Sequence, residues 1–178
     1  MENPNQTRFT HCPSCGNTTL LPRNGKSFQC SECQFLFYMN CAAAAMGLIT
    51  NAQGQLLVTR RKRNPAAGTL DFPGGFIEPG ESAEEGLKRE IKEELNLDVL
   101  KMTYLTSAPN TYQFKDVEYA VTDLAFICEV GDLTTIQADD DVEDFFFMDM
   151  DKINPNDFGL DSPKKVIRRY QQYLSQQG

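Results

Sequence analysis

The stretch GGFIEPGESAEEGLKREIKEELNL, residues 74–97, carries the pattern that decides the fold. It holds seven glutamates, far more negative charge than the segments on either side of it. A solvated helix face would explain this charge, and so would a site built to hold a cation. The spacing of the glutamates and the residues around them separate the two interpretations.

A helix is predicted from Ser82 to about Leu95. Glu85 follows Ser82 by three residues, which is the capping-box pattern, in which each side chain accepts a hydrogen bond from the other residue's backbone amide. Asn96 suits the left-handed position that ends a helix. The glycines and proline of residues 72–75 predict a sharp loop ahead of the helix.

Three of the glutamates fall on one face of this helix. Glu90, Glu93 and Glu94 are three and four residues apart, so their side chains cluster. Leu87 and Ile91 form a neighbouring stripe that is expected to face the core, so the acidic cluster borders the core, where carboxylates can line a cleft. Hard divalent cations such as Mg²⁺ prefer oxygen ligands of this kind and share them with phosphates. Spacing alone leaves a charged face and a metal site about equally open.

The wider pattern resembles the Nudix box, G-x5-E-x7-R-E-U-x-E-E-x-G-U, in which U is aliphatic. Gly75 and Glu81 match its first two fixed positions, and residues 89–97 (REIKEELNL) match the rest, with Asn96 in place of the late glycine. Asparagine is the next-best residue after glycine for a left-handed helix cap. The resemblance extends from about Asn40 to the C-terminus.

The resemblance implies an α+β fold, the Nudix α/β/α sandwich with a mixed sheet. It also implies hydrolysis, dependent on Mg²⁺ or Mn²⁺, of the pyrophosphate bond in a nucleoside diphosphate linked to another moiety. In the family, the residue matching Arg89 usually pairs with the one matching Glu81, and Glu93 could serve as base or as ligand. The catalytic positions implied are Glu81, Arg89, Glu90, Glu93 and Glu94. The metal ligands implied are Glu90, Glu93, Glu94 and the backbone carbonyl at Gly74 or Gly75.

Many Nudix enzymes add a carboxylate from a later loop. The acidic run at residues 139–144 lies where that loop is expected, just before an apolar strand. Asp141 is favoured by position, with Asp140 and Glu143 as competitors. A solubilising acidic loop explains any single one of these residues equally well.

Four of the six cysteines form two C-x2-C pairs, which predict a zinc ribbon over residues 1–39. Two such knuckles supply the tetrahedral thiolate set that structural zinc prefers, and a unit this small needs a staple in place of a core. Two redox thiol pairs are the alternative. His11 is expected to be a bystander, because four cysteines close the site. The predicted zinc ligands are Cys12, Cys15, Cys30 and Cys33.

A cysteine ribbon ahead of a Nudix domain at residues 40–178 is similar to the NADH pyrophosphatase group, which cleaves NADH and removes NAD caps from RNA. That group carries S-Q-P-W-P-F-P-x-S downstream of the box. Residues 107–114 here read SAPNTYQF. Ser107 and Pro109 match, whereas the tryptophan and the later prolines do not, so the chain lacks this substrate motif. ADP-ribose and NADH are the leading substrates.

Other segments supply candidate substrate contacts. The guanidinium groups of Arg60, Arg61 and Arg63 match phosphate geometry, although a solvated basic stretch is equally consistent with the pattern. Tyr112 or Phe114 could stack on a base or act as a packing aromatic.

Alternating and apolar patterns predict the remaining elements. The final helix is expected to begin with Ser162 as N-cap and Pro163 in the first turn, and to pack on the sheet. The predicted strands are residues 42–49, 55–60, 97–107, 117–130 and 143–149.

Composition narrows the function classes. The net charge of −8 argues against general electrostatic binding of nucleic acid, and capped RNA is the only nucleic acid that stays a candidate partner. No run approaches the roughly 18 apolar residues of a membrane span, and no secretory signal is present, so a cytoplasmic location is expected. A ribbon that only braces the catalytic domain or a homodimer fits these features. The alternative from another class is a nucleotide-sensing regulatory protein whose ribbon binds nucleic acid or a partner.

Overall fold

The computed structural model describes residues 2–177. The chain forms two compact units, one made of the residues up to 41 together with 111–120, the other of 42–110 with 121 onward. The division into domains 1–39 and 40–178 remains a prediction. Among the described residues, no helix is long and apolar enough to cross a membrane.

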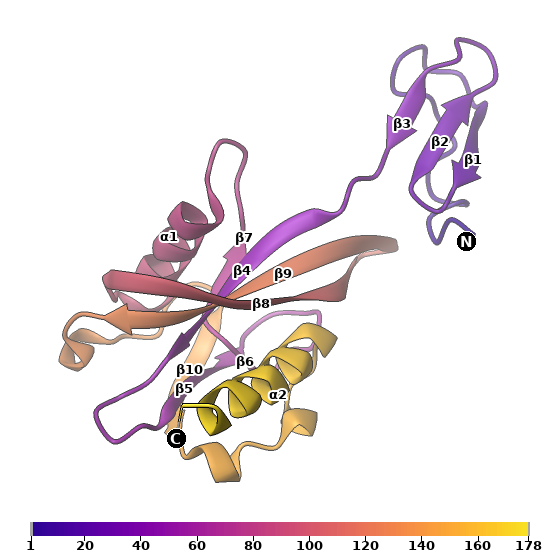
Figure 1. Ribbon diagram of the computed structural model, residues 1–178. Coiled ribbons are helices and arrows are strands. Elements are labelled where there is room, and N and C mark those ends of the chain that lie inside the picture. The colour runs from indigo at the N-terminus through magenta and orange to yellow at the C-terminus, as the bar shows by residue number, and fades with distance from the viewer. Residues whose placement is uncertain (1, 178) are drawn as a thin grey trace. The chain divides into compact units, whose positions relative to one another are not determined.

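The first unit is built on a three-stranded antiparallel sheet. Its strands are β1 (Leu20–Asn24), β2 (Ser27–Cys30) and β3 (Leu36–Tyr38), in the order β1-β2-β3 (Figure 1). Phe28 is fully buried, and the rings of Phe9 and Phe37 lie 5.6 and 6.1 Å from its ring. Cys12 and Cys30 are buried in the same small cluster. The sheet therefore has a core of few residues, in which cysteines take part.

The second unit contains two sheets. β4 (Ala42–Ile49) runs parallel to β9 (Val117–Val130) and antiparallel to β7 (Gly74–Phe76), and β8 (Val99–Phe114) borders β9. β5 (Leu56–Arg61) pairs antiparallel with both β6 (Leu70–Asp71) and β10 (Val142–Met148). The larger sheet is therefore mixed, as predicted.

Two α-helices and three 3-10 turns complete this unit. The helices are α1 (Ala83–Leu95) and α2 (Asp161–Ser175). The turns are η1 (Leu133–Thr135), η2 (Met150–Lys152) and η3 (Pro155–Asp157).

The two helices lie on opposite sides of the strands, and each buries one face against them (Figure 1). Alternation along β4 and β9 sends successive side chains to the two sides. α1 contributes Leu87, Ile91 and Leu95 to a core with Ala45, Ile49, Leu57, Phe126 and Cys128. α2 contributes Val166, Ile167 and Tyr170 to a core with Met46, Leu48, Leu56, Val58 and Ala125. The predicted α/β/α sandwich is confirmed.

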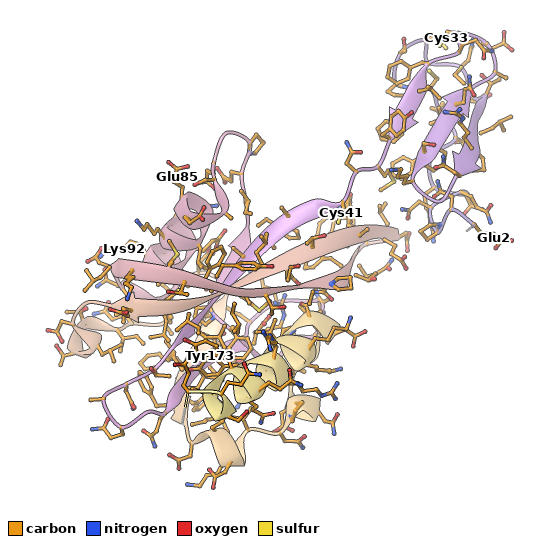
Figure 2. All side chains as sticks on the ribbon, in the orientation of Figure 1. Glu2, Cys33, Cys41, Glu85, Lys92 and Tyr173 are labelled. Atoms are coloured by element: carbon orange, nitrogen blue, oxygen red, sulfur yellow. The ribbon has the colours of Figure 1, made fainter. Side chains whose placement is uncertain are left out.

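α1 begins and ends as the sequence predicts. The Ser82 side chain accepts a hydrogen bond from the Glu85 amide, and the Glu85 carboxylate accepts one from the Ser82 amide. Asn96 has a φ of 55°, in the left-handed region, and its amide donates to the Lys92 carbonyl. Glu85 and Lys92 are exposed on this helix (Figure 2).

Three expected boundaries are wrong. α2 has Leu160 rather than Ser162 as N-cap, because the Ser162 hydroxyl donates to the buried carboxylate of Asp123 instead. β8 continues to residue 114 rather than 107, alongside β9. The expected loop at 72–75 includes the start of β7, because Gly74 and Gly75 pair with β4.

Candidate active site and cysteine cluster

The loop ahead of α1 lies tightly between β4 and the helix. Gly74 has a φ of 138°, and a Cβ at this position would lie 2.1 Å from the Ala45 carbonyl oxygen. No other residue type fits this approach without moving β4. The Gly74 amide donates to Oε2 of Glu94 at 2.8 Å, so the loop is joined directly to the helix.

Glu94 is the most buried of the box glutamates, with 6% of its surface exposed. Burial raises the pKa of its carboxyl well above the usual value, and the charges of Glu90, Asp71 and Asp141 act in the same direction, against the hydrogen bond from Gly74. A buried carboxylate among like charges is stabilised in its charged form by a cation beside it. This position could therefore hold a cation.

Glu90 and Glu93 continue the acidic face towards solvent. A Cβ on Gly75 would lie 2.5 Å from the carboxyl carbon of Glu90, so the backbone and this side chain are in contact. Burial raises the pKa of Glu90, and hydrogen bonding to Arg89 opposes the shift. The Glu93 side chain is 50% exposed, and its Oε2 lies 3.1 Å from Nη1 of Arg89.

Arg89 joins the acidic face to the loop. Its Nε and Nη2 donate to the two oxygens of Glu81 at 2.8 and 3.0 Å, and Nη2 also donates to the Phe76 carbonyl at 3.1 Å. Its Nη1 donates to Glu90 at 2.8 Å. Hydrogen bonds from Arg89 lower the pKa of Glu81 to about 2, so this bidentate pair is fully charged at neutral pH.

The acidic run before β10 provides a second set of carboxylates. Oδ1 of Asp141 lies 2.7 Å from Nη1 of Arg63, and Oδ1 of Asp140 lies 3.9 Å from Nη2 of the same guanidinium. The charges of Asp140 and Asp141 help to raise the pKa values of Glu90 and Glu94 respectively. The sequence candidates Arg63 and Asp141 thus pair with each other, and Glu143 lies exposed on β10.

The remaining basic candidates are engaged within the protein. Arg60 donates to the Gly68 carbonyl at 2.7 Å and lies over the Phe146 ring, 5.1 Å from its centroid. Arg61 forms an ion pair with Asp71 at 2.6 Å. Tyr112 and Phe114 belong to the other compact unit; Tyr112 is half-buried, and Phe114 is 52% exposed beside Lys115.

Sequence analysis missed two carboxylates that are shielded from water: Asp123, which is buried, and Asp71, whose side chain is 14% exposed. Burial raises the pKa of both carboxyls. Asp123 accepts hydrogen bonds from Ser162 and from Asn110, the latter at 2.9 Å. The available signal was position: each is a single acidic residue among apolar residues, and alternation along β9 points Asp123 inward with Val121 and Ala125.

The four predicted cysteines come together in the first unit. Their sulfur atoms all lie within 4.8 Å of one another, and Cys33 lies in the turn after β2 (Figure 2). Hydrogen bonding from Thr19, and then from backbone amides, lowers the pKa of Cys30 to about 6. At Cys15 the Asn17 amide lowers the pKa, but desolvation and the neighbouring sulfurs outweigh it and raise the value to about 12. Crowded thiols that cannot all ionise alone are chemically suited to a thiophilic cation.

Within residues 2–177, no other group of three or more metal-binding side chains gathers this closely. The carboxylate oxygens of Glu90, Glu93 and Glu94 therefore lie on one helix face but are not all as close to one another as the four sulfur atoms are. Arg89 holds two of them by ion pairs.

Residues 41–170 match the NUDIX domain family. The chain belongs to the Nudix family. It is 32% identical to the ADP-ribose pyrophosphatase of Methanocaldococcus jannaschii over 144 residues, which cover 79% of each protein. It is also 32% identical over 98 residues to the NAD-capped RNA hydrolase NudC of Vibrio vulnificus, covering 55% of this chain and 37% of that protein.

A solved Nudix hydrolase from Nitrosomonas europaea has the same fold, with a TM-score of 0.64 and 18% identity over 92% of this chain and 91% of that one. The chain spans little more than a third of the length of the NudC protein it matches. The predicted enzyme class, a Nudix pyrophosphohydrolase, is confirmed by the family match and these relatives.

Proposed function

We propose that this Nudix hydrolase cleaves the pyrophosphate bond of a nucleoside diphosphate linked to another moiety, in a reaction that depends on Mg²⁺ or Mn²⁺. One observation carries the proposal. Glu94 is held out of water against the Gly74 amide, among the charges of Glu90, Asp71 and Asp141. An arrangement of like charges on a catalytic fold is stabilised by a divalent cation.

The residues that would hold the metal are Glu90, Glu93, Glu94 and the Gly75 carbonyl, with Asp141 as the later carboxylate. When bound, the metal neutralises the pyrophosphate and lowers the pKa of water. Arg89 and Glu81 hold the loop against the helix, so that the carbonyl and the carboxylates stay in register. Glu93, the most exposed of the three glutamates, would serve either as a metal ligand or as the base that takes the proton of the attacking water.

Release of the Arg63–Asp141 ion pair would free both partners for substrate. Both side chains are more than half exposed, so this pair contributes little stability and can exchange partners cheaply. Arg63 would then contact a phosphate, and Asp141 would turn to the metal. Arg60, with one hydrogen bond to the Gly68 carbonyl, is the second phosphate candidate.

ADP-ribose is the substrate we place first, ahead of NADH. One relative, which is 32% identical and is matched over 79% of both chains, is an ADP-ribose pyrophosphatase. The segment at 107–114 departs from the substrate motif of NADH pyrophosphatases, and the chain contains no tryptophan. Tyr112 and Phe114 remain candidates for stacking on the base.

The cysteine cluster is proposed to bind one structural Zn²⁺. Four sulfurs within 4.8 Å of one another supply the tetrahedral thiolate set of such sites. In this proposal the ribbon has a structural role and needs no nucleic-acid partner, because residues 1–41 carry few cations.

A mass-spectrometric screen with Mg²⁺ tests the function. ADP-ribose, NADH, dinucleoside polyphosphates and nucleotide sugars are incubated separately with the protein, and with Glu94→Gln as the blank. The expected result is conversion of ADP-ribose into AMP and ribose 5-phosphate by the wild type alone. In ¹⁸O-labelled water, the product that carries the label shows which phosphorus is attacked. Absence of cleavage of every substrate would contradict the proposal.

A further inference from the structure

A largely buried ion pair joins Arg61 to Asp71, outside both the Nudix box and the cysteine cluster. Nη1 of Arg61 lies 2.6 Å from Oδ2 of Asp71, and the side chains are 22% and 14% exposed. Taking two charges out of water costs free energy that a well-packed apolar pair would not cost. Stability of the fold is therefore a poor explanation for this pair.

Each partner is tied to the chain that leads into the box. Nε of Arg61 donates to the Pro65 carbonyl at 2.8 Å, and this hydrogen bond ties the loop between β5 and β6 to the end of β5. Oδ1 of Asp71 accepts a hydrogen bond from the Phe72 amide at 2.9 Å. The Thr59 hydroxyl donates to the Asp71 carbonyl at 3.3 Å. The ion pair thus fixes the point at which residues 72–75 leave the sheet.

Residues 72–75 lead directly to two of the box glutamates. The Pro73 carbonyl accepts a hydrogen bond from the Gly47 amide at 2.8 Å, and the Gly74 amide donates to Glu94. At Gly75 the backbone is in contact with the carboxylate of Glu90. A small rotation at Asp71 would move both the amide and the neighbouring carbonyl relative to these carboxylates.

We propose that Arg61 and Asp71 are positioning residues of the Nudix site. Their ion pair holds residues 72–75 so that the Gly74 amide stays on Glu94 and the Gly75 backbone stays against Glu90. Arg61 acts on the site through the loop and not by touching a phosphate. The role in catalysis rests on the proposed metal-dependent function, whereas the ordering of the loop can be tested without it.

The first test measures hydrogen exchange of the loop in protein to which no Mg²⁺ or Mn²⁺ has been added. The variants are Arg61→Met, Asp71→Leu and the double variant, and the matched control is Lys101→Met/Glu129→Leu, which removes an ion pair whose side chains are both 66% exposed. Hydrogen exchange followed by mass spectrometry should show faster exchange of residues 72–76 in all three variants and no change in the control. Exchange that is unchanged in the double variant would overturn the proposal.

The second test measures metal binding. Mn²⁺ titration followed by electron paramagnetic resonance should show affinity about 10- to 100-fold weaker in each single variant. The double variant should be no weaker than the singles, because the two residues act as one unit. If Arg61→Met raises KM but leaves Mn²⁺ affinity unchanged, Arg61 is a phosphate contact and the proposal is wrong.

The two tests separate this proposal from the proposed function. A single variant leaves a charge buried without its partner and can fail to fold, whereas the double variant removes both charges and keeps the comparison valid. A wild type that binds no Mn²⁺ and cleaves no pyrophosphate would refute the function, and the exchange of residues 72–76 would still decide whether the ion pair positions the loop.

Discussion

The two compact units place the side chains that we propose to bind cations by opposite means. In the first unit, Cys12 and Cys30 are two of the four buried residues of the core, so half of the proposed ligands belong to the core itself. In the second, Leu87 and Ile91 are buried in an apolar core, while Glu94 is buried against the Gly74 amide and the Glu93 side chain is 50% exposed. There the core fixes the helix, and the helix carries the glutamates at its border.

This difference predicts different consequences of losing a ligand. A small sheet with few apolar side chains cannot offset the conformational entropy of folding without a cross-link or metal. A unit with apolar cores on both faces of its strands keeps its fold when one carboxylate is changed. Loss of a cysteine from the cluster should therefore unfold the first unit, whereas loss of a box glutamate should leave the second unit folded.

Loss of zinc should have the largest effect. The variant Cys30→Ser should contain no zinc, against one ion per wild-type chain, and β1 to β3 should lose protection from hydrogen exchange. Structural zinc contributes about 10–16 kcal/mol of apparent binding free energy to small domains of this kind. The second unit should keep its protection.

Elemental analysis of protein purified without chelator measures the zinc, and Cys41→Ser, outside the cluster, is the control. Wild-type protein without zinc would refute the ribbon proposal. Loss of protection in both units would refute the contrast between them.

The variant Glu94→Gln should lose catalysis and keep the fold. Removal of a direct metal ligand is expected to lower turnover by more than the roughly 100-fold that loss of an outer partner can cost. Because burial raises the pKa of Glu94, the folded state favours its neutral form, which glutamine supplies at every pH. The thermal midpoint without metal should therefore stay equal or rise.

Turnover in a pyrophosphate-release assay and thermal unfolding provide the two measurements for Glu94→Gln. Glu84→Gln, an exposed glutamate in the first turn of the same helix, is the control and should keep full activity. Retained turnover in Glu94→Gln would refute the assignment of the site.

The helix α1 shows what the sequence could predict. Its ends depend on contacts between residues three or four apart, so Ser82, Glu85 and Asn96 specify them locally. The start of α2 was missed because the Ser162 hydroxyl has a distant partner, Asp123, that competes with capping. β6, with two residues, is too short for any periodic pattern and exists through pairing with β5.

The candidate site divides in the same way. Helical spacing alone predicts that Glu90, Glu93 and Glu94 share one face of the helix. Pairing of Arg63 with Asp141 joins residues far apart in the chain, and no local pattern records it. The burial of Asp71 depends likewise on Arg61, a partner across the β5–β6 hairpin.

Acid should weaken the loop brace formed by Glu81 and Arg89. Hydrogen bonds from Arg89 hold the pKa of Glu81 at about 2, below its ordinary value of 4.5. The folded state therefore binds the proton more weakly than the unfolded state does. The stability from this pair is fully present above about pH 4.5 and is lost as the pH falls towards 2.

Denaturant unfolding at a series of pH values between 2 and 6 tests this linkage. Glu81→Gln should show a shallower decline in the free energy of unfolding over the acid range than the wild type. Glu84→Gln serves again as the control. Equal slopes in Glu81→Gln and wild type would show that the ion pair contributes no pH-dependent stability.

The two caps of α1 should give the smallest and most unequal effects. Ser82→Ala removes the acceptor for the Glu85 amide and should cost about 1 kcal/mol of stability. Asn96→Gly should change stability by less than about 0.5 kcal/mol, because the glycine relieves a φ of 55° but loses the Asn96 side-chain hydrogen bond to the Thr135 carbonyl. Activity should stay unchanged in Asn96→Gly, since the departure from the Nudix box at this position affects only the helix end. Thermal unfolding and turnover measure both variants, and a large loss of activity in Asn96→Gly would mean that the asparagine has a role in the site beyond capping.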